Sequence, residues 1–181
     1  TTGGFGMALA NNDMLFENMA LLLSHGVTRD PRLWQDEPAG PWHHEQQALG
    51  FNYRLTDLQA ALGQSQLQRL DEFITKRSAL ANRYDKLLAD FPLQRPTIQP
   101  GASSAWHLYV VRLLPEAPVD RRIVFEALRE AGFGVQLHYH PVHLQPYYRE
   151  QGFEHGDYPE AERHGQTALS LPLHPGLTEE Q

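Results

Sequence analysis

The stretch LGFNYRLTDLQAALG, residues 49–63, marks the point where a loop enters the strongest predicted helix of the chain. Thr56 and Gln59 have the spacing of a capping box, in which each side chain bonds to the other residue's backbone N–H. Apolar residues then recur at helical spacing until Pro92, which ends the pattern because proline has no N–H to donate. A long helix over residues 56–91 is therefore predicted.

That helix is long enough to join two subdomains. At 1.5 Å per residue it would reach roughly 50 Å. Long helices are rarely straight, so a kink or break is expected at Gly63 or within residues 71–76.

Upstream of this stretch, the sequence predicts a strand, a helix and a long loop. The apolar run Gly6–Ala10 favours a buried strand, and Asn11-Asn12-Asp13 favours a turn that caps a helix over Met14–Ser24. Gly26 is suited to the left-handed conformation that ends such a helix. Residues 27–50 are rich in Pro, Gly, Trp and His without a sustained period, which predicts a long ordered loop of the kind that is often functional.

Downstream, strands and helices alternate. A helix that Asp120 caps and Gly132 closes lies between two predicted strands, Trp106–Leu113 and Val135–Tyr139. The β-α-β order, with a right-handed crossover if the strands are parallel, predicts a small α+β domain from about residue 92. Two short helices and a short strand are expected to follow, at Pro146–Gln151, Pro159–Thr167 and Leu169–Leu171.

Composition excludes several classes of partner. The net charge is -7, and no run of Lys and Arg exceeds two residues, so no electrostatic footprint for nucleic acid or for an anionic membrane is expected. The apolar stretches are too short to span a bilayer. The absence of cysteine excludes disulfides and thiolate metal sites, which fits a reducing cytoplasm.

Asn52 and Arg54 are candidate phosphate ligands because they stand just before the capped helix. An amide and a guanidinium both donate hydrogen bonds, and the N–H groups at a helix entrance also favour anions. The same residue types are equally compatible with a loop held to its own backbone. Spacing alone leaves both interpretations open.

The histidines offer a second set of candidates. His138, His140 and His143 could form a metal site, because alternate strand residues share a face and neutral imidazole is a common ligand. Pro141 interrupts the strand, however, and no nearby carboxylate completes the set. Ordinary loop histidines and ligand-contacting histidines are the other interpretations. The adjacent pair His43-His44 is expected to be structural.

Gly3, Gly4 and Gly6 suggest a loop that cradles a phosphate. The spacing matches neither the dinucleotide-binding fingerprint nor the P-loop, so a tight turn before a strand is the simpler interpretation.

Taken together, five segments resemble the DegT/StrS family of sugar aminotransferases that depend on pyridoxal phosphate (PLP). They cover nearly the whole sequence, and residues 49–63 carry the most specific likeness, to the family pattern GYNYRMTDIQAALG. The wording HLQPYY is typical of the pseudaminic-acid pathway and spore-coat-polysaccharide branch. The five are TTGGFGM followed by Asn12-Asp13, Ser24-His25-Gly26, residues 49–63, HYHPVHLQPYY at 138–148, and SLPLHP at 170–175 followed by Leu177-Thr178.

The resemblance implies an α/β fold, the C-terminal part of a type I PLP-dependent transferase. Residues 1–55 would be the end of the large PLP-binding domain, residues 56–91 the long linking helix, and residues 92–181 the small C-terminal α+β domain. It also implies a cytoplasmic homodimer whose active sites lie at the subunit interface.

The implied reaction moves an amino group from glutamate to a keto nucleotide-sugar in polysaccharide or glycan biosynthesis. By match to the family, Asn52 would donate to the PLP phosphate of the neighbouring subunit, and Arg54 would support that site or the substrate carboxylate. His143 and Tyr139 would face the sugar-nucleotide. No metal is implied.

Several positions depart from the family pattern. The only lysines are Lys76 and Lys86, on the predicted long helix, so neither matches the lysine that forms the Schiff base with PLP. That lysine is expected upstream of Thr1. Glu and Gly are common in the family where Gly4 and Phe5 stand, and His43-His44 replace what are often tyrosines.

The chain is therefore expected to be a fragment, cut at both ends. Its closing residues Thr178–Gln181 have the form of a capping box without the helix that it would start. Such a fragment would be inactive alone. The alternative hypothesis is a homologue or module that binds a sugar or a partner without chemistry.

Overall fold

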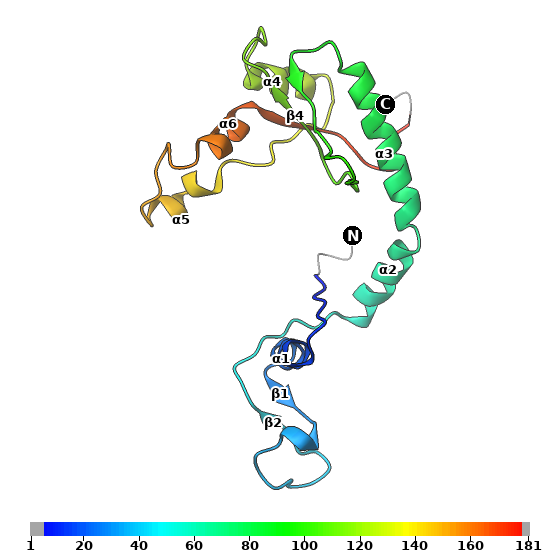
Figure 1. The fold of residues 1–181 in the computed structure, drawn as a ribbon, viewed down its shortest axis with the longest axis vertical. Helices are drawn as coiled ribbons and strands as arrows, with labels where there is room; N and C mark the ends of the chain where they lie inside the picture. Colours follow the sequence, from blue (N-terminus) through cyan, green and yellow to red (C-terminus); the bar gives the residue numbers. More distant parts are fainter. Residues whose placement is uncertain (1–5, 179–181) are drawn as a thin grey trace. The chain divides into compact units, whose positions relative to one another are not determined.

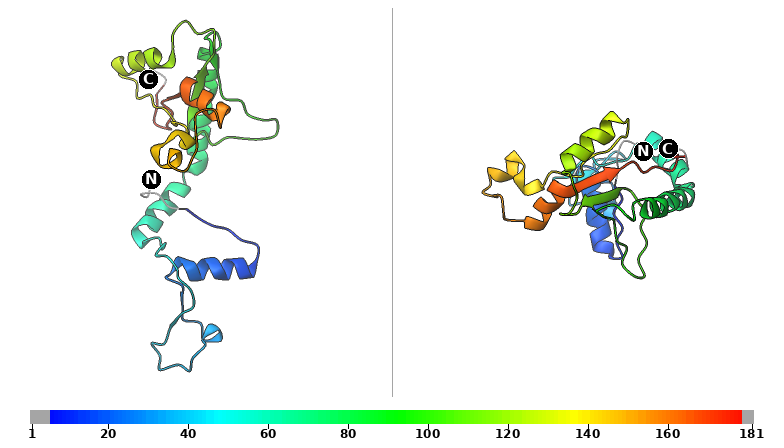
Figure 2. Two further views of the ribbon diagram at one scale, coloured as in Figure 1. Left: turned by 90° about the vertical axis from the view of Figure 1, so that its left-hand side faces the viewer. Right: turned by 90° about the horizontal axis from the view of Figure 1, so that it is seen from above.

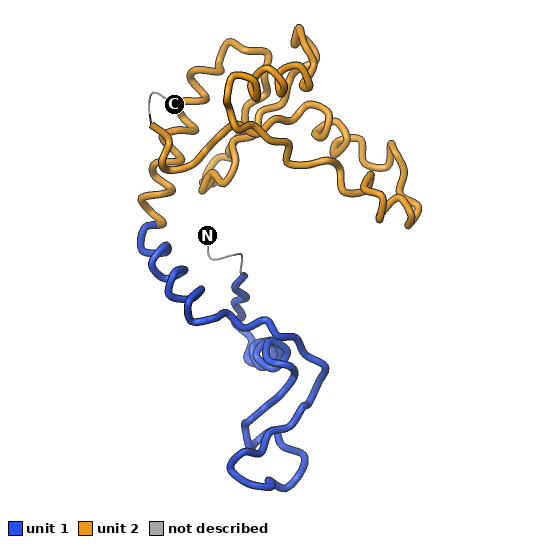
Figure 3. The backbone as a smooth tube through the Cα atoms, turned by 180° about the vertical axis from the view of Figure 1, so that it is seen from behind, with its two compact units in different colours: residues 1–69 blue, residues 70–181 orange. Residues whose placement is uncertain are grey.

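A computed structural model describes residues 6–178, and the chain divides into two compact units, residues 1–69 and 70–181 (Figure 3). Two expectations fall wholly or partly outside the described residues. These are the glycine-rich segment at Gly3-Gly4 and the end of the closing capping box at Glu179–Gln181.

Helix α1, Asp13–Leu23, opens the described part of the first unit (Figure 1). The Asn12 Oδ1 atom accepts a hydrogen bond from the backbone N–H of Leu15 at 2.9 Å, as the predicted cap requires. At the other end, the N–H of Gly26 bonds to the carbonyl of Leu21 with φ +68°. The predicted helix and both of its ends are confirmed to within one residue.

The strand expected at Gly6–Ala10 is wrong. These residues have no regular secondary structure, and four of the five are exposed. A strand needs a neighbour with which to exchange backbone hydrogen bonds, and none pairs with this segment in the described part of the chain. An apolar run alone does not supply that neighbour.

Residues 27–50 are ordered and contain more regular structure than a loop. Strands β1, Val27–Thr28, and β2, Glu45–Gln46, pair antiparallel, with Val27 opposite Gln46. The 3₁₀ turn η1, Pro31–Leu33, lies between them. This pair of short strands joins the beginning of the segment to a point near its end.

Helix α2, Asp57–Leu67, begins with the predicted capping box, complete in both directions between Thr56 and Gln59. The break that the length of 56–91 implied lies at Gln68-Arg69, because the next helix, α3, covers Leu70–Leu87. The Arg69 N–H bonds to the carbonyl of Gln66, which is a tightened 3₁₀-type turn. Both predicted positions of the break were wrong.

Gly63 lies inside α2 and residues 71–76 lie inside α3. One glycine in a helix costs about 1 kcal/mol relative to alanine, which is too little to end a helix by itself.

The second unit is built on a three-stranded antiparallel sheet of order β3-β4-β5 (Figures 1 and 2). Strand β4, Tyr109–Leu113, is central and buries alternate residues. Its neighbours are β3, Leu93–Gln94, and β5, Ala168–Leu171, with Val111 opposite Leu169. The predicted strand at 106–113 is confirmed in a shorter form, and the one at 169–171 is confirmed with Ala168 added.

No strand forms at 135–139, so a parallel β-α-β unit is also wrong. Gln136 alone exchanges two backbone hydrogen bonds with Ser170, at 3.2 and 2.8 Å. The chain then leaves the sheet toward Pro141, which has no N–H to continue a ladder. The edge beside β5 is therefore held by a single bridge.

Four short helical segments complete the unit. Helix α4, Arg121–Glu130, has Asp120 as its cap, with Oδ1 accepting from the Ile123 N–H at 3.0 Å. The other three are η2, Val142–Leu144, α5, Pro146–Arg149, and α6, Pro159–Thr167. Within the described residues, no helix is both long enough and apolar enough to cross a membrane.

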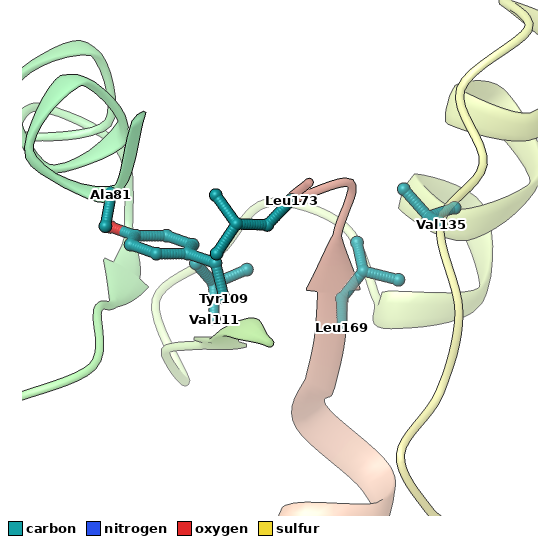
Figure 4. Packing of buried hydrophobic residues seen from close by; sticks show 6 residues of the cluster. All are labelled: Ala81, Tyr109, Val111, Val135, Leu169 and Leu173. Atoms are coloured by element: carbon teal, nitrogen blue, oxygen red, sulfur yellow. The ribbon is translucent and has the colours of Figure 1, made fainter. Parts of the chain in front are cut away.

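One apolar cluster joins α3, α4 and the sheet (Figure 4). The fully buried side chains of Tyr109, Val111 and Leu169 form its centre, and Ala81 packs from α3. Burying apolar area at about 25 cal/mol per Å² makes this cluster the main stabilising feature of the unit.

Side-chain hydrogen bonds also join α3 to the segments just before β4 and just after β5. One guanidinium nitrogen of Arg77 donates to the carbonyls of Trp106 at 2.8 Å and Leu173 at 3.0 Å. The Tyr84 hydroxyl donates to the carbonyl of Pro172 at 2.8 Å. The SLPLHP segment is therefore tied to α3 by side chains as well as by packing.

Candidate functional site

Two segments that resemble family motifs meet at the end of α1. Asn52 forms a backbone bridge with Ser24, and the N–H of His25 donates to the carbonyl of Phe51 at 2.8 Å. The N–H of Tyr53 bonds to the carbonyl of Leu23 at 3.0 Å. Residues 24–26 and 51–53 thus form one small platform.

The platform depends on two glycines. A Cβ atom on Gly26 would lie 1.8 Å from the carbonyl oxygen of Ala48, and one on Gly50 would lie 2.1 Å from the backbone nitrogen of Gly26. Neither position has room for any other residue. His25 precedes Gly26 with φ +62°, a left-handed conformation that is uncommon for a side chain larger than glycine and is often found at functional sites.

Three side chains converge on this platform. Arg54 Nε donates to the Asn52 Oδ1 atom at 3.1 Å, and an Arg54 Nη atom lies 3.4 Å from His25 Nε2. Since arginine only donates, His25 Nε2 is the acceptor and its proton sits on Nδ1. The Asn52 oxygen is occupied, so the amide presents its NH₂ group as a donor.

The resulting set fits the phosphate of PLP. All three side chains are exposed, and Asn52 and Arg54 carry hydrogen-bond donors just before α2, where backbone N–H groups also favour an anion. His25 was not among the predicted site residues. The Ser24-His25-Gly26 segment was visible in the sequence, but nothing in it indicated that the ring would accept from Arg54.

A carboxylate organises the loop that follows. The two Glu45 oxygens accept from the N–H groups of Gln35 and Asp36 at 2.8 and 2.9 Å, and His43 Nε2 lies 3.2 Å away. Hydrogen bonds, from those two backbone groups first, lower the pKa of Glu45 to about 2. The His43 ring also contacts Trp34 edge-on at 4.6 Å. His43 therefore has the structural role that was predicted for it.

In the second unit, His143 is buried against Glu162. His143 Nε2 lies 3.0 Å from Glu162 Oε1, and the two side chains are 7% and 6% exposed. The same carboxylate accepts from the N–H of Gly156 at 2.7 Å and pairs with His155 Nδ1 at 2.7 Å. The Tyr158 ring covers His143 edge-on at 4.9 Å.

The other histidines of this segment have hydrogen-bond partners different from those of His143. His138 Nδ1 pairs with the Ser170 hydroxyl at 2.8 Å, and the His138 carbonyl is 3.1 Å from His164 Nε2. His140 is exposed. Among the residues that the structure describes, no group of three or more His, Cys, Asp or Glu side chains could hold a metal ion. The metal interpretation of His138, His140 and His143 therefore has no geometric support.

The predicted site residues thus differ in their surroundings. Asn52 and Arg54 share a hydrogen bond, as a joint role requires. Tyr139 is 70% exposed and available to a ligand, whereas His143 offers little surface of its own. An open pocket of about 860 Å³ has His140, Arg149 and His155 among its lining residues, whereas Tyr139 and His143 do not line it. Nothing in the sequence indicated Glu162, which pairs both with His143 and with the pocket-lining His155.

Comparison with known proteins agrees with these motifs. Residues 1–181 match the DegT/DnrJ/EryC1/StrS aminotransferase family over their whole length. The spore coat polysaccharide biosynthesis protein SpsC of Bacillus subtilis is 34% identical over 99% of this chain and 47% of its own length. A Campylobacter jejuni protein, UDP-4-amino-4,6-dideoxy-N-acetyl-beta-L-altrosamine transaminase, is 36% identical over 83% of this chain and 38% of its own.

Solved structures give the same result. Helicobacter pylori PseC, an aminotransferase involved in the biosynthesis of pseudoaminic acid, superposes with a TM-score of 0.80 and 29% identity. The match covers 94% of this chain and 43% of PseC. The chain thus spans less than half the length of the relatives described here, and PLP is the cofactor of their family, as predicted. The chain belongs to the DegT/DnrJ/EryC1/StrS aminotransferase family.

Proposed function

We propose that the whole protein is a PLP-dependent aminotransferase that moves an amino group from glutamate to a keto nucleotide-sugar in polysaccharide or glycan biosynthesis. The similarity to SpsC and to the altrosamine transaminase supports a sugar substrate. The observation that carries the proposal is the hydrogen-bonded set of Asn52, Arg54 and His25 at the platform, which offers donors beside a capped helix. When bound, PLP supplies the electron sink that such a transfer needs.

The residues of this chain would hold the cofactor and the substrate. The Asn52 amide would donate to the PLP phosphate of the partner subunit in a cytoplasmic homodimer, and Arg54 would hold the amide in place. Tyr139 and His143 would meet the sugar-nucleotide. In this proposal residues 1–55 belong to the large domain, 56–91 link the domains, and 92–181 form the small domain.

The Schiff-base lysine would come from outside residues 1–181. Lys76 and Lys86 both lie on α3, and Lys76 Nζ pairs with Glu72 at 2.7 Å. Neither lies in a segment that matches a family motif. Residues 1–181 alone are therefore expected to be inactive.

The test is a titration of the whole apoprotein with PLP, followed by absorbance of the lysine-bound cofactor. Asn52→Ala should weaken PLP binding roughly tenfold, since a hydrogen bond to a charged group contributes about 1.5–3 kcal/mol. Asn82→Ala is the matched control, because Asn82 is exposed on α3. A whole protein that binds nucleotide-sugar but never forms the absorbance band would instead be a non-catalytic sugar-binding homologue.

A further inference from the structure

Glu162 is a buried carboxylate on α6 that receives hydrogen bonds from three directions. Its Oε1 atom lies 3.0 Å from His143 Nε2 and 2.7 Å from the N–H of Gly156, and its Oε2 atom lies 2.7 Å from His155 Nδ1. Glu162 is 6% exposed, whereas Glu160, two residues earlier, is exposed and pairs with Arg163. A helix that needed only solubility would not bury a carboxylate here.

The carboxylate is ionised at neutral pH. Burial raises the pKa of Glu162, but the hydrogen bonds from Gly156 and His143 and the charges of the two histidines outweigh burial, so its pKa lies below the usual value. An ionised carboxylate only accepts hydrogen bonds. The nitrogen of His143 that faces it must therefore carry a proton.

A proton on Nε2 determines what Nδ1, the other nitrogen of the His143 ring, can do. If Nε2 holds the proton of the neutral imidazole, then Nδ1 carries a lone pair. Among the described residues, Nδ1 of His143 has no hydrogen-bond partner. It is also not a fully buried atom, so it keeps some contact with solvent. The Nε2 edge of the ring thus faces Glu162, whereas Nδ1 has no partner within the described residues.

Neighbouring groups hold the ring in this orientation. Tyr158 contacts it edge-on at 4.9 Å, and Nδ1 of the exposed His155 lies 2.7 Å from Glu162 Oε2. The backbone N–H of Gly156 donates to Glu162 Oε1 at 2.7 Å and is the third group that holds the carboxylate.

We propose that Glu162 is a positioning residue that fixes His143 as the Nε2–H tautomer and so presents Nδ1 as a hydrogen-bond acceptor to a hydroxyl or amide N–H of the sugar-nucleotide. The ligand part of this inference rests on the proposed function, in which His143 meets the substrate. The tautomer part concerns this chain alone.

The experiment uses the whole protein loaded with PLP and labelled with ¹⁵N-histidine. Long-range ¹H–¹⁵N spectra report which nitrogen of His143 is protonated, with His143→Gln for assignment. At pH 7.5 the wild type should show the Nε2–H tautomer. Glu162→Gln should introduce the Nδ1–H form, because the amide no longer requires a donor at Nε2. Glu162→Asp should restore the wild-type tautomer in part, and Glu160→Gln should leave it unchanged.

Kinetics test the ligand part. Glu162→Gln should lower kcat/KM for nucleotide-sugar roughly tenfold, mainly through KM. Adding nucleotide-sugar should move the Nδ1 resonance in the wild type. Circular dichroism and thermal melting confirm that each variant is folded.

Two results would overturn the inference: an Nδ1–H tautomer in the folded wild type, or spectra and kinetics of Glu162→Gln that match those of Glu160→Gln. If the protein showed no transamination but the tautomer changed as expected, the proposed function would fail while the positioning role stood.

Discussion

The hydroxyl of Tyr109 donates to the Oδ1 atom of Asp85 across 2.6 Å, which joins the central strand β4 to helix α3 in the middle of the second unit. Tyr109 is fully buried, and its ring lies 5.0 Å from that of Tyr84. Burial first, and then the hydrogen bond to Asp85, raise the pKa of Tyr109 well above its ordinary value. The neutral hydroxyl is therefore part of the folded state.

Tyr109→Phe should destabilise the whole protein by about 1–3 kcal/mol, because it leaves the half-buried Asp85 carboxylate without its donor. Urea denaturation measures the change. Since the folded pKa is raised, the contribution of the tyrosine is complete below its unfolded pKa of about 10 and is lost above it. The difference between wild type and variant should therefore shrink at alkaline pH. Tyr147→Phe, at a site 69% exposed, is the control, and an equal loss there would contradict the interpretation.

Glu45→Gln should loosen the loop of residues 27–50. The neutral amide replaces a carboxylate that accepts from the N–H groups of Gln35 and Asp36. Hydrogen exchange followed by mass spectrometry should show faster exchange at those two amides than in the wild type. Glu37→Gln, an exposed change in the same loop, should have no effect.

The same loop should respond to acid. The pKa of Glu45 is depressed to about 2 from an ordinary value of 4.5. A depressed pKa contributes stability above the unfolded value and loses it as pH falls through the folded value. Protection of the Gln35 and Asp36 amides should therefore fall between about pH 4.5 and pH 2 in the wild type and stay flat in Glu45→Gln. A flat wild-type profile would contradict the prediction.

Gly50→Ala should separate the two segments that form the platform. The new Cβ atom would lie 2.1 Å from the backbone nitrogen of Gly26, and backbone cannot move aside as a flexible side chain can. Stability should fall by at least about 1–3 kcal/mol, the usual range for overpacking. Affinity for PLP should fall with it. Gly134→Ala is the matched control, because its Cβ would meet no atom within 4 Å.

Local signals in the sequence predicted local structure well. The side chains of Asn12, Thr56 and Asp120 all cap helices where expected, since a cap depends on residues only three positions apart. Gly6–Ala10 and residues 135–139 were wrong for the opposite reason. A strand forms only with a partner distant in sequence, and neither segment indicates its partner.

The same difference between local contacts and contacts distant in sequence applies to the candidate site. Asn52 and Arg54 are two positions apart, so the hydrogen bond between them lies within a single motif of the sequence. The pairing of His143 with Glu162 spans nineteen positions and depends on how α6 packs. Sequence alone therefore indicated the histidine and missed the carboxylate that determines its protonation.

Arg54→Lys separates the charge of Arg54 from its geometry. The guanidinium contacts Asn52 Oδ1 at 3.1 Å through Nε and His25 Nε2 at 3.4 Å through another nitrogen. A lysine keeps the positive charge, but its single ammonium cannot reproduce this planar fork. The Asn52 amide would lose its fixed orientation, so the affinity of the whole apoprotein for PLP should fall roughly tenfold. Fluorescence titration with PLP measures it. Arg29→Lys, exposed in the same unit, should bind as the wild type does. If Arg54→Lys also bound PLP normally, charge alone would suffice and the platform would not orient Asn52.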